Sequence, residues 1–209
     1  MLKADANGDA REDAIMEDSG KEPKDVAIIL LKATSLPDER IFLEMNQPRY
    51  TTVDYYRMAC NLLFKCRRCG TCCATGNPIR IRTEDAAALA RHFKIPLNKA
   101  VKKYTANDTD KPGSLVFKHT LPCKFYDAKE RGCKLYLARP WSCRIFPFLG
   151  IYGSEDRVKV NESCHGSVET MKVLMASLQE ARSDPAILAL SPEEIRAAKE
   201  KLRAVLDAV

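Results

Sequence analysis

The sequence predicts an α+β protein with a cysteine-rich core of short strands and loops, flanked by helices. Three observations support this fold class. Apolar residues repeat at helical spacing before residue 65 and after residue 167, whereas alternation with a two-residue period is confined to brief stretches between them. Eight of the nine cysteines fall in that middle part. At 209 residues, the chain is long enough to bury a core of its own.

Composition divides the chain into four parts. Residues 1–24 contain four basic and seven acidic residues and no aromatic residue, so we expect a disordered tail. Residues 25–65 are expected to form an N-terminal helical or extended segment. Residues 66–166 form the cysteine-rich domain, and residues 167–209 are expected to form a C-terminal helical pair.

The N-terminal segment contains one ambiguous run and one clear helix. The apolar run from Val26 to Leu31 fits either a strand or a short buried helix. Thr52 is expected to cap a helix that continues to about Phe64 and carries Cys60 on its apolar face. Because free cysteine is among the most buried residue types, we expect Cys60 to be a core thiol.

Short strands and helices follow the first cysteines. Residues 79–82 alternate as in a brief strand, and Thr83 begins an amphipathic helix. Pro96 separates this helix from a second one that runs toward Tyr104. Residues 115–121 alternate again and predict another strand.

Two hairpins and two helices are expected in the last third of the chain. The first hairpin turns through residues 127–132, and the second pairs a strand near residue 150 with residues 158–160. Beyond Cys164 the apolar residues recur at helical spacing. The run from Ser191 to Glu194 combines an N-cap serine, a proline and a capping-box glutamate, so it predicts the start of the last helix. We expect both helices to pack on the core, with partner binding as the alternative.

The early part of the chain predicts a cytoplasmic protein without membrane contact. The first 24 residues contain no apolar run of the kind found in secretory signals, and the run from Val26 to Leu31 is far shorter than the roughly 20 residues that span a bilayer. Cytosolic thiols stay reduced and are available as ligands. An odd number of cysteines also fits a fully paired disulfide framework poorly.

The basic charge of the chain lies near the cysteines. Six basic residues and no acidic residue occur between residues 57 and 82. Nucleic-acid-binding modules usually interleave such charges with aromatic residues, and this sequence does not, so we expect no nucleic-acid partner. We interpret the positive charge as compensation for the negative charge of thiolates.

Eight cysteines form two groups along the sequence, four within eight residues and four spread over forty-two. They are Cys66, Cys69, Cys72, Cys73, Cys123, Cys133, Cys143 and Cys164. A spacing of two residues lets a tight turn aim two sulfurs at one ion about 2.3 Å away, and Gly70 tolerates the backbone conformation that this turn needs. Neighbouring side chains in extended backbone point to opposite sides. Cys72 and Cys73 therefore either serve different centres, or one of them is not a direct ligand.

The kind of metal stays open at this point. Soft thiolates suit both zinc and iron–sulfur clusters. The spacing from Cys66 to Cys72 matches the start of a bacterial ferredoxin run, but the Cys-Pro that would complete the run is missing. His165 could act as a nitrogen ligand, although eight thiolates already fill two tetrahedra.

The cysteines belong to a longer series of motifs. The series is Cys66-x2-Cys69-Gly70-x-Cys72-Cys73, Leu121-Pro122-Cys123-x-Phe125, Gly132-Cys133-x2-Tyr136, Arg139-Pro140-x2-Cys143-Arg144-x-Phe146-Pro147 and Cys164-His165-Gly166. This order resembles the YkgJ-type cysteine-cluster family, whose members are described as zinc- or iron-chelating proteins. The resemblance covers residues 66–166. It implies that all eight cysteines are metal ligands and that Arg139 and Arg144 frame the cofactor.

Members of this family are frequently labelled iron–sulfur oxidoreductases. We expect a metal-binding protein that coordinates an iron–sulfur cluster, with electron transfer as its role and an iron–sulfur oxidoreductase component as the corresponding enzyme class. We expect a redox partner or another protein partner. Two alternatives stay open, a zinc-binding structural or interaction module and a methyltransferase-like enzyme with a structural cluster. No glycine-rich nucleotide loop follows a predicted strand, so no motif supports an S-adenosylmethionine pocket directly. The oligomeric state is not predicted.

Overall fold

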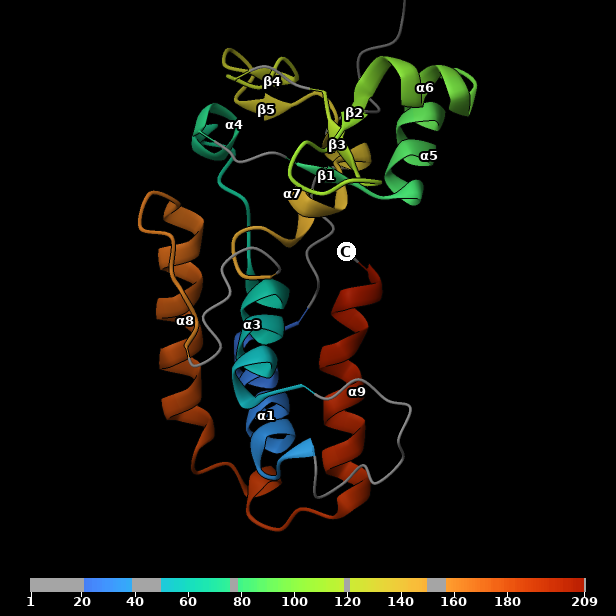
Figure 1. Ribbon diagram of the computed structural model, residues 1–209. Coiled ribbons are helices and arrows are strands. Elements are labelled where there is room, and N and C mark those ends of the chain that lie inside the picture. The colour runs from blue at the N-terminus through green and yellow to red at the C-terminus, as the bar shows by residue number, and fades with distance from the viewer. Residues whose placement is uncertain (1–20, 39–49, 76–78, 119–120, 150–156, 209) are drawn as a thin grey trace, which may run out of the picture.

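The structure is a computed structural model that describes residues 21–38, 50–75, 79–118, 121–149 and 157–208. It has two layers, a bundle of long helices and a smaller part that carries the short strands and the cysteine segment (Figure 1). The strand pairs are antiparallel. This arrangement confirms the α+β class. No helix within the described ranges is long and apolar enough to cross a membrane.

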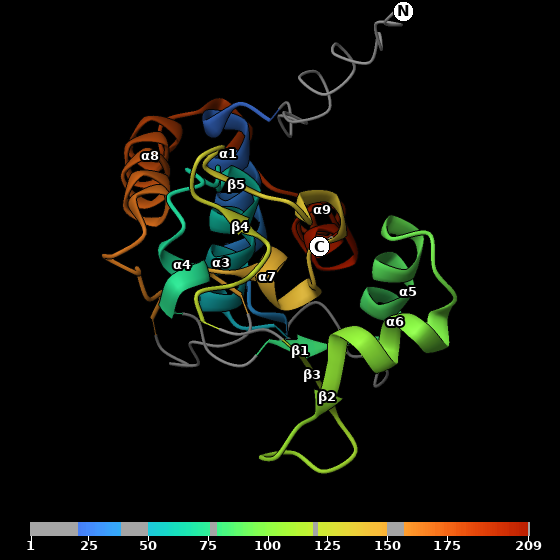
Figure 2. The ribbon, with the colours of Figure 1, turned by 90° about the horizontal axis from the view of Figure 1, so that it is seen from above.

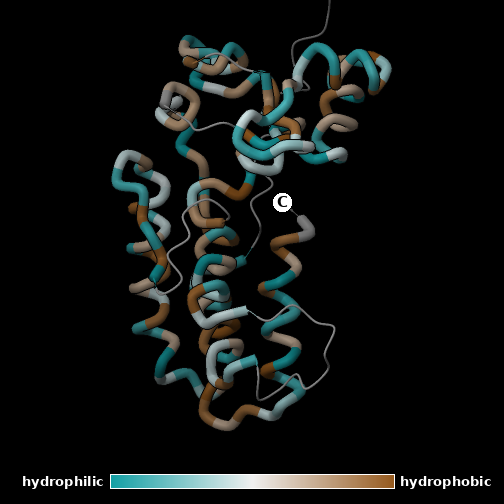
Figure 3. The backbone as a smooth tube through the Cα atoms, in the orientation of Figure 1, coloured by the Kyte–Doolittle hydropathy of each residue, from teal (hydrophilic) through white to brown (hydrophobic). Residues whose placement is uncertain are grey.

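Four helices from both ends of the chain form the bundle. They are α1 (Pro23–Thr34), α3 (Thr52–Leu63), α8 (His165–Ala181) and α9 (Pro192–Ala208). Helix α1 packs on the other three, and α3 also packs on α8 and α9. Their shared core buries Leu30, Met58, Leu174 and Leu202. Hydrophobic and hydrophilic residues alternate along α8 and α9, as expected for helices with one buried face (Figure 3).

The apolar run from Val26 to Leu31 lies in α1, which decides between the strand and the helix expected from sequence. Val26, Ala27 and Leu30 are buried, and this spacing places them on one face of a helix. Pro23 begins the helix, because the first helical position needs no N–H donor. The helix thus begins inside the segment expected to be a tail, of which residues 1–20 lie outside the described residues.

The starts of α3 and α9 follow their sequence signals closely. Thr51, one residue earlier than expected, caps α3, and its Oγ1 accepts a hydrogen bond from the Asp54 N–H at 3.2 Å. At α9 the Glu194 N–H donates to Ser191 Oγ at 3.2 Å, while the Ser191 N–H donates to Glu194 Oε2 at 2.9 Å. The predicted capping box at Ser191 is therefore confirmed.

The smaller part contains short elements in two groups. The first group is β1 (Arg80–Ile81), α5 (Thr83–His92), α6 (Leu97–Tyr104), β2 (Thr105–Asn107) and β3 (Leu115–Phe117). The second is α4 (Thr71–Thr75), β4 (Tyr126–Asp127), β5 (Gly132–Cys133), the 3-10 helix η2 (Tyr136–Ala138) and α7 (Trp141–Ile145). A further 3-10 helix, η3 (Pro185–Ile187), joins α8 to α9.

The first group builds a second hydrophobic core. Strand β3 lies between β1 and β2, with Val116 opposite both Arg80 and Ala106. Helix α5 contributes Leu89 and helix α6 contributes Tyr104 to this core, where they join Ile81 and Phe117 of the sheet. In both views these two helices lie on the side of the molecule away from α8 (Figures 1 and 2).

Two strand predictions need correction. Strand β3 ends at Phe117, short of the predicted end at residue 121, and residues 119–120 lie outside the described residues. Residues 158–160 have no regular secondary structure, although their alternation predicted a strand. Val158 packs against the bundle core, so its burial does not depend on a strand partner. The predicted turn of this hairpin, near residue 153, lies outside the described residues.

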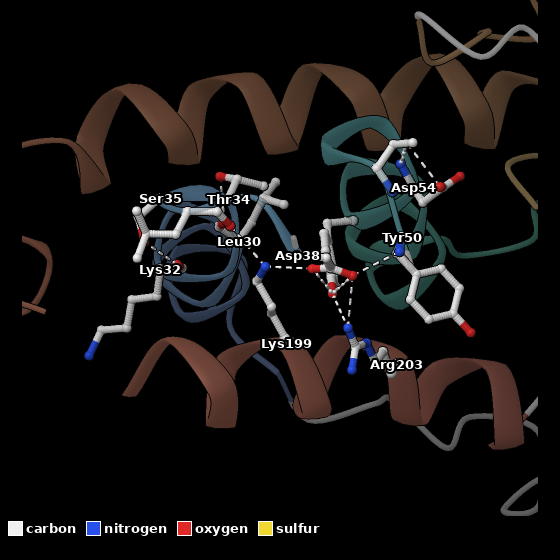
Figure 4. A network of polar contacts seen from close by, with 12 residues as sticks. Leu30, Lys32, Thr34, Ser35, Asp38, Tyr50, Asp54, Lys199 and Arg203 are labelled. Carbon is white, nitrogen blue, oxygen red and sulfur yellow. Dashed lines mark hydrogen bonds and ion pairs between the residues drawn. The ribbon is translucent and has the colours of Figure 1, made fainter. Parts of the chain in front are cut away.

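A buried charge network connects the chain after α1 to α9 and α3 (Figure 4). The Asp38 carboxylate, 3% exposed, accepts hydrogen bonds from Lys199 Nζ, from Arg203 Nη2 at 3.0 Å and from the Tyr55 hydroxyl at 3.0 Å. The Tyr50 N–H donates to the same carboxylate at 2.8 Å. Lys199 has no exposed surface, so both partners of this ion pair are desolvated.

The network also sets the protonation of Asp38. Burial alone would raise the pKa of this carboxyl, but the hydrogen bonds from Lys199 and Tyr50 outweigh it, so the pKa lies below its ordinary value of 3.8. Because the folded pKa is lowered, the contribution to stability is fully present above about pH 4. It is lost as the pH falls through the folded pKa.

We predict that Asp38→Ala lowers the free energy of unfolding by about 3–5 kcal/mol, because it leaves the buried Lys199 ammonium without its carboxylate. Urea unfolding followed by far-UV circular dichroism at pH 7 measures the change. Lys201→Ala, at an exposed position on the same helix, is the control and should change stability by about 0.5 kcal/mol or less. Equal effects of the two variants would contradict the role of the network.

Candidate metal centre

All eight cysteines of the predicted ligand set line one cavity of about 240 Å³. They reach it from the chain between α3 and α4, from α4, from the segment around β4 and β5, from α7 and from the start of α8. Among the described residues, no three His, Cys, Asp or Glu side chains lie close enough together to hold one metal ion as they stand. The eight thiols surround the cavity.

The first cysteine run is shaped by Gly70. Its φ of +82° lies in the left-handed region, which glycine adopts without the steric cost of a Cβ. A Cβ at this position would also overlap the Tyr126 ring, so the turn packs directly on strand β4. The Arg68 N–H donates to Cys66 Sγ at 3.4 Å, and the Cys73 N–H donates to the Gly70 carbonyl at 2.9 Å.

The hairpin of β4 and β5 brings two more cysteines to the same place. The Cys123 N–H donates to the Cys73 carbonyl at 2.7 Å, and the Tyr126 N–H donates to the Cys123 carbonyl at 2.9 Å. Cys133 lies opposite Tyr126 in the antiparallel pair. Main-chain hydrogen bonds therefore connect Cys73, Cys123 and Cys133 although sixty residues of sequence separate the first from the last.

Cys143 is held by the short helix α7, and Asp85 fixes the start of that helix. The buried Asp85 carboxylate accepts the Trp141 N–H at 2.7 Å and the Arg82 N–H at 2.9 Å. The Arg144 Nη2 lies 3.5 Å from the same carboxylate. Because Cys143 stands between Trp141 and Arg144, a single acidic side chain at the start of α5 positions this ligand from both sides.

Cys164 stands at the N-terminal end of α8, against the chain that enters the first cysteine run. A Cβ at Gly166 would lie 2.7 Å from the Lys65 carbonyl oxygen, so only glycine allows the first turn of α8 to approach this closely. Arg67 and Glu169 form an ion pair across the same junction. These contacts bring Cys66 and Cys164 into the same part of the cavity wall.

Burial and neighbouring thiolates make Cys133, Cys143 and Cys164 harder to ionise than a free thiol. Burial raises the pKa of Cys143 to about 12 and also raises the pKa values of Cys133 and Cys164. The Cys73 thiol donates a hydrogen bond to the Cys72 sulfur, which lowers the pKa of Cys72 and raises that of Cys73. Metal binding at these positions must therefore displace thiol protons.

Arg139 supplies positive charge at the cavity wall. Its charge lowers the pKa values of Cys72, Cys133 and Cys143, partly opposing burial. Its guanidinium lies 3.8 Å from the centroid of the Tyr136 ring, and its Nε donates to the Tyr136 carbonyl at 3.1 Å. The cofactor role expected for Arg139 stays a prediction, now with a position in the cavity wall.

Other expected site residues lie elsewhere. Cys60 is fully buried in the bundle core, where burial raises its pKa to about 12, so the prediction of a core thiol is confirmed. His165 is exposed. Arg144, which was expected to frame the cofactor, pairs with Asp85. The sequence shows an acidic residue, Asp85, near the start of α5. No sequence pattern predicts its contact with Trp141, 56 residues later.

We predict that Asp85→Asn loosens the Cys143 side of the cavity. The N–H groups of Trp141 and Arg82 each donate to a different oxygen of the Asp85 carboxylate, whereas asparagine has only one side-chain oxygen. One N–H would lose its acceptor, and a buried unsatisfied donor costs about 1–3 kcal/mol. The free energy of unfolding should fall by this amount, and bound metal should be lost faster to a chelator. Glu84→Gln, on the exposed side of the same helix turn, should change neither quantity.

Comparisons with known proteins agree with the cysteine pattern. A family model described as "CxxCxxCC: Putative zinc- or iron-chelating domain" matches residues 65–165. One similar protein is the uncharacterized protein MJ0661 of Methanocaldococcus jannaschii, which is 31% identical over 87 residues, 42% of this chain and 46% of that protein. The chain thus matches less than half the length of this relative. No solved structure matches the chain.

Proposed function

Since residues 65–165 form a domain of the CxxCxxCC family of zinc- or iron-chelating domains, the chain is a metal-binding cysteine-cluster protein, and we propose that it holds iron–sulfur centres and exchanges electrons. The eight thiols that line the cavity would be the ligands. The donor set fits this group, because iron–sulfur clusters are held by cysteine thiolates. When bound, such a cluster supplies reversible electron exchange.

The convergence of eight thiols on one cavity carries the proposal. A single closed zinc site uses four ligands that meet at one ion about 2.0–2.3 Å away, so one such ion would leave half of these thiols unused. Iron and sulfide atoms would lie between the thiolates.

Charge and exposure support electron exchange at this site. Arg139 opposes the negative charge that thiolates and sulfides bring into a partly buried cavity. Cys69 and Cys72 are exposed, whereas the other six cavity cysteines are partly covered. The edge of the cavity near α4 is thus where a redox partner could approach the centre.

We predict that protein purified without oxygen is brown and contains iron together with acid-labile sulfide. Elemental analysis and the visible absorption spectrum measure this directly. Cys60→Ala is the control. Cys60 is buried in the bundle core, away from the cavity, so its replacement should leave the iron content unchanged. Colourless protein with about two zinc ions per chain would contradict the redox proposal and favour a zinc-stabilised module.

We also predict that Arg139→Gln lowers the midpoint reduction potential of the centre, because removing a nearby positive charge makes the addition of an electron less favourable. Arg139→Lys keeps the charge and should restore most of the potential. Spectroelectrochemical titration compares both with Arg91→Gln, an exposed position on α5. A similar shift in all three variants would show that charge at the cavity wall is not the cause.

A further inference from the structure

We infer that a second cavity, separate from the metal cavity, binds a small carboxylate with an apolar body. This cavity measures about 460 Å³ and shares no lining residue with the metal cavity. Binding sites for small molecules typically measure roughly 300–1,000 Å³. The inference goes beyond the proposed function, because it does not depend on which metal the thiols hold.

The second cavity lies next to the metal cavity, between β1, the start of α5, α6, the start of β3 and α7 (Figure 1). Ile79 and Ser142 line the metal cavity, whereas their neighbours Arg80 and Trp141 line the second one. The Ser142 hydroxyl donates to the Arg80 carbonyl at 3.1 Å and so joins the two segments. The chain around β1 and α7 therefore contributes to the walls of both cavities.

Apolar side chains from five elements form much of the wall of the second cavity. One of them, Leu97, is 47% exposed although it lies on a helix that buries Ala100 and Tyr104. An apolar ligand body in the cavity would remove part of this leucine surface from water, which is favourable. The apolar lining residues are Ile81, Ala86, Leu97, Val101, Leu115 and Trp141.

Arg82 supplies a cation at this cavity. Its guanidinium carbon lies 5.1 Å from the centroid of the Trp141 ring, and its Nε lies 3.5 Å from the exposed Glu84 carboxylate. It donates no hydrogen bond to another described residue, whereas the Arg80 Nε donates to the buried Asp108 carboxylate at 3.3 Å. Exposed ion pairs contribute little free energy, so Arg82 can exchange Glu84 for a ligand carboxylate that matches its planar fork.

Trp141 leaves a second hydrogen-bonding position open. Its main-chain N–H donates to Asp85, but its indole Nε1 is buried and has no acceptor within the described part of the chain. Buried donors in proteins normally have a partner, because a donor without one is costly. An acceptor oxygen that a ligand brings to the Trp141 wall would remove this cost.

The charges at the cavity favour a carboxylate over a phosphate. Asp108 pairs with Arg80, and Glu84 pairs with Arg82, so positive and negative side chains are equal in number there. The buried Asp85 carboxylate, at the start of α5, lies 3.5 Å from Arg144 Nη2. A ligand with a single negative charge would therefore meet less repulsion from these carboxylates than a doubly charged phosphate.

Octanoate is the probe that tests this site. Trp141 is the only tryptophan of the chain, so its fluorescence reports on this cavity. We expect wild-type protein to bind about one octanoate per chain, with a saturable change in fluorescence and the same stoichiometry by calorimetry. Acetate lacks the apolar body and octanamide lacks the charge, so each should bind at least about tenfold more weakly.

Two variants with matched controls test the two parts of the site. Arg82→Gln should weaken octanoate binding about tenfold and leave octanamide binding unchanged, because it removes only the charge. Arg91→Gln, at an exposed position on the same helix, should change neither. Leu97→Ser should weaken both ligands, whereas Leu188→Ser, at a 74% exposed leucine that does not line the cavity, should weaken neither.

The inference would be overturned by wild-type protein that shows no saturable octanoate binding. Octanoate binding that Arg82→Gln and Leu97→Ser both leave unchanged would place the ligand elsewhere and overturn it as well. Displacement of octanoate by an equal concentration of inorganic phosphate would contradict the carboxylate assignment. Metal content, measured in the same samples, tests the proposed function separately, and far-UV circular dichroism checks that each variant is folded.

Discussion

The packing of α3 against α8 is the contact on which the arrangement of the thiols depends. Helix α3 delivers the chain to Cys66, and α8 begins directly after Cys164. Because both helices are buried in the same bundle core, the end of one and the start of the other are held at a fixed distance. Because Gly166 has no Cβ, the first turn of α8 can lie directly against the Lys65 carbonyl. The bundle therefore holds Cys164, at the start of α8, close to the cysteine run that follows α3.

Buried charges are balanced separately in the two parts of the molecule. In the bundle, Asp38 neutralises Lys199 and fixes the chain after α1 to α9. In the cysteine part, Asp85 uses its carboxylate mainly to accept main-chain N–H groups and so holds α7 in place. Arg139 faces the thiols instead, where positive charge offsets thiolate charge. Asp38 and Asp85 are positioned by contacts far away in sequence, so their roles depend on the complete fold, whereas Arg139 is held by Tyr136, three residues before it.

The cavity differs from a zinc knuckle in the number of chain segments around it. A knuckle is formed by local turns that place ligands near one ion. Here five segments contribute thiols, and only the first run is local. Such a site forms only when the surrounding helices and hairpin have packed, so metal binding and tertiary folding should stabilise each other.

The sequence by itself determined the local elements and the residue types of the site. Helical period and capping signals placed α5 and the Ser191 start of α9 correctly, and the cysteine spacing identified the thiols that line the cavity. These features depend on neighbours within a few residues. Tertiary structure alone decided that the run from Val26 is a helix, that Val158 is not in a strand, and that the start of α8 lies against Lys65 at the entry to the first cysteine run. The reason is physical, because each of those outcomes depends on burial against segments distant in the chain, which no local pattern records.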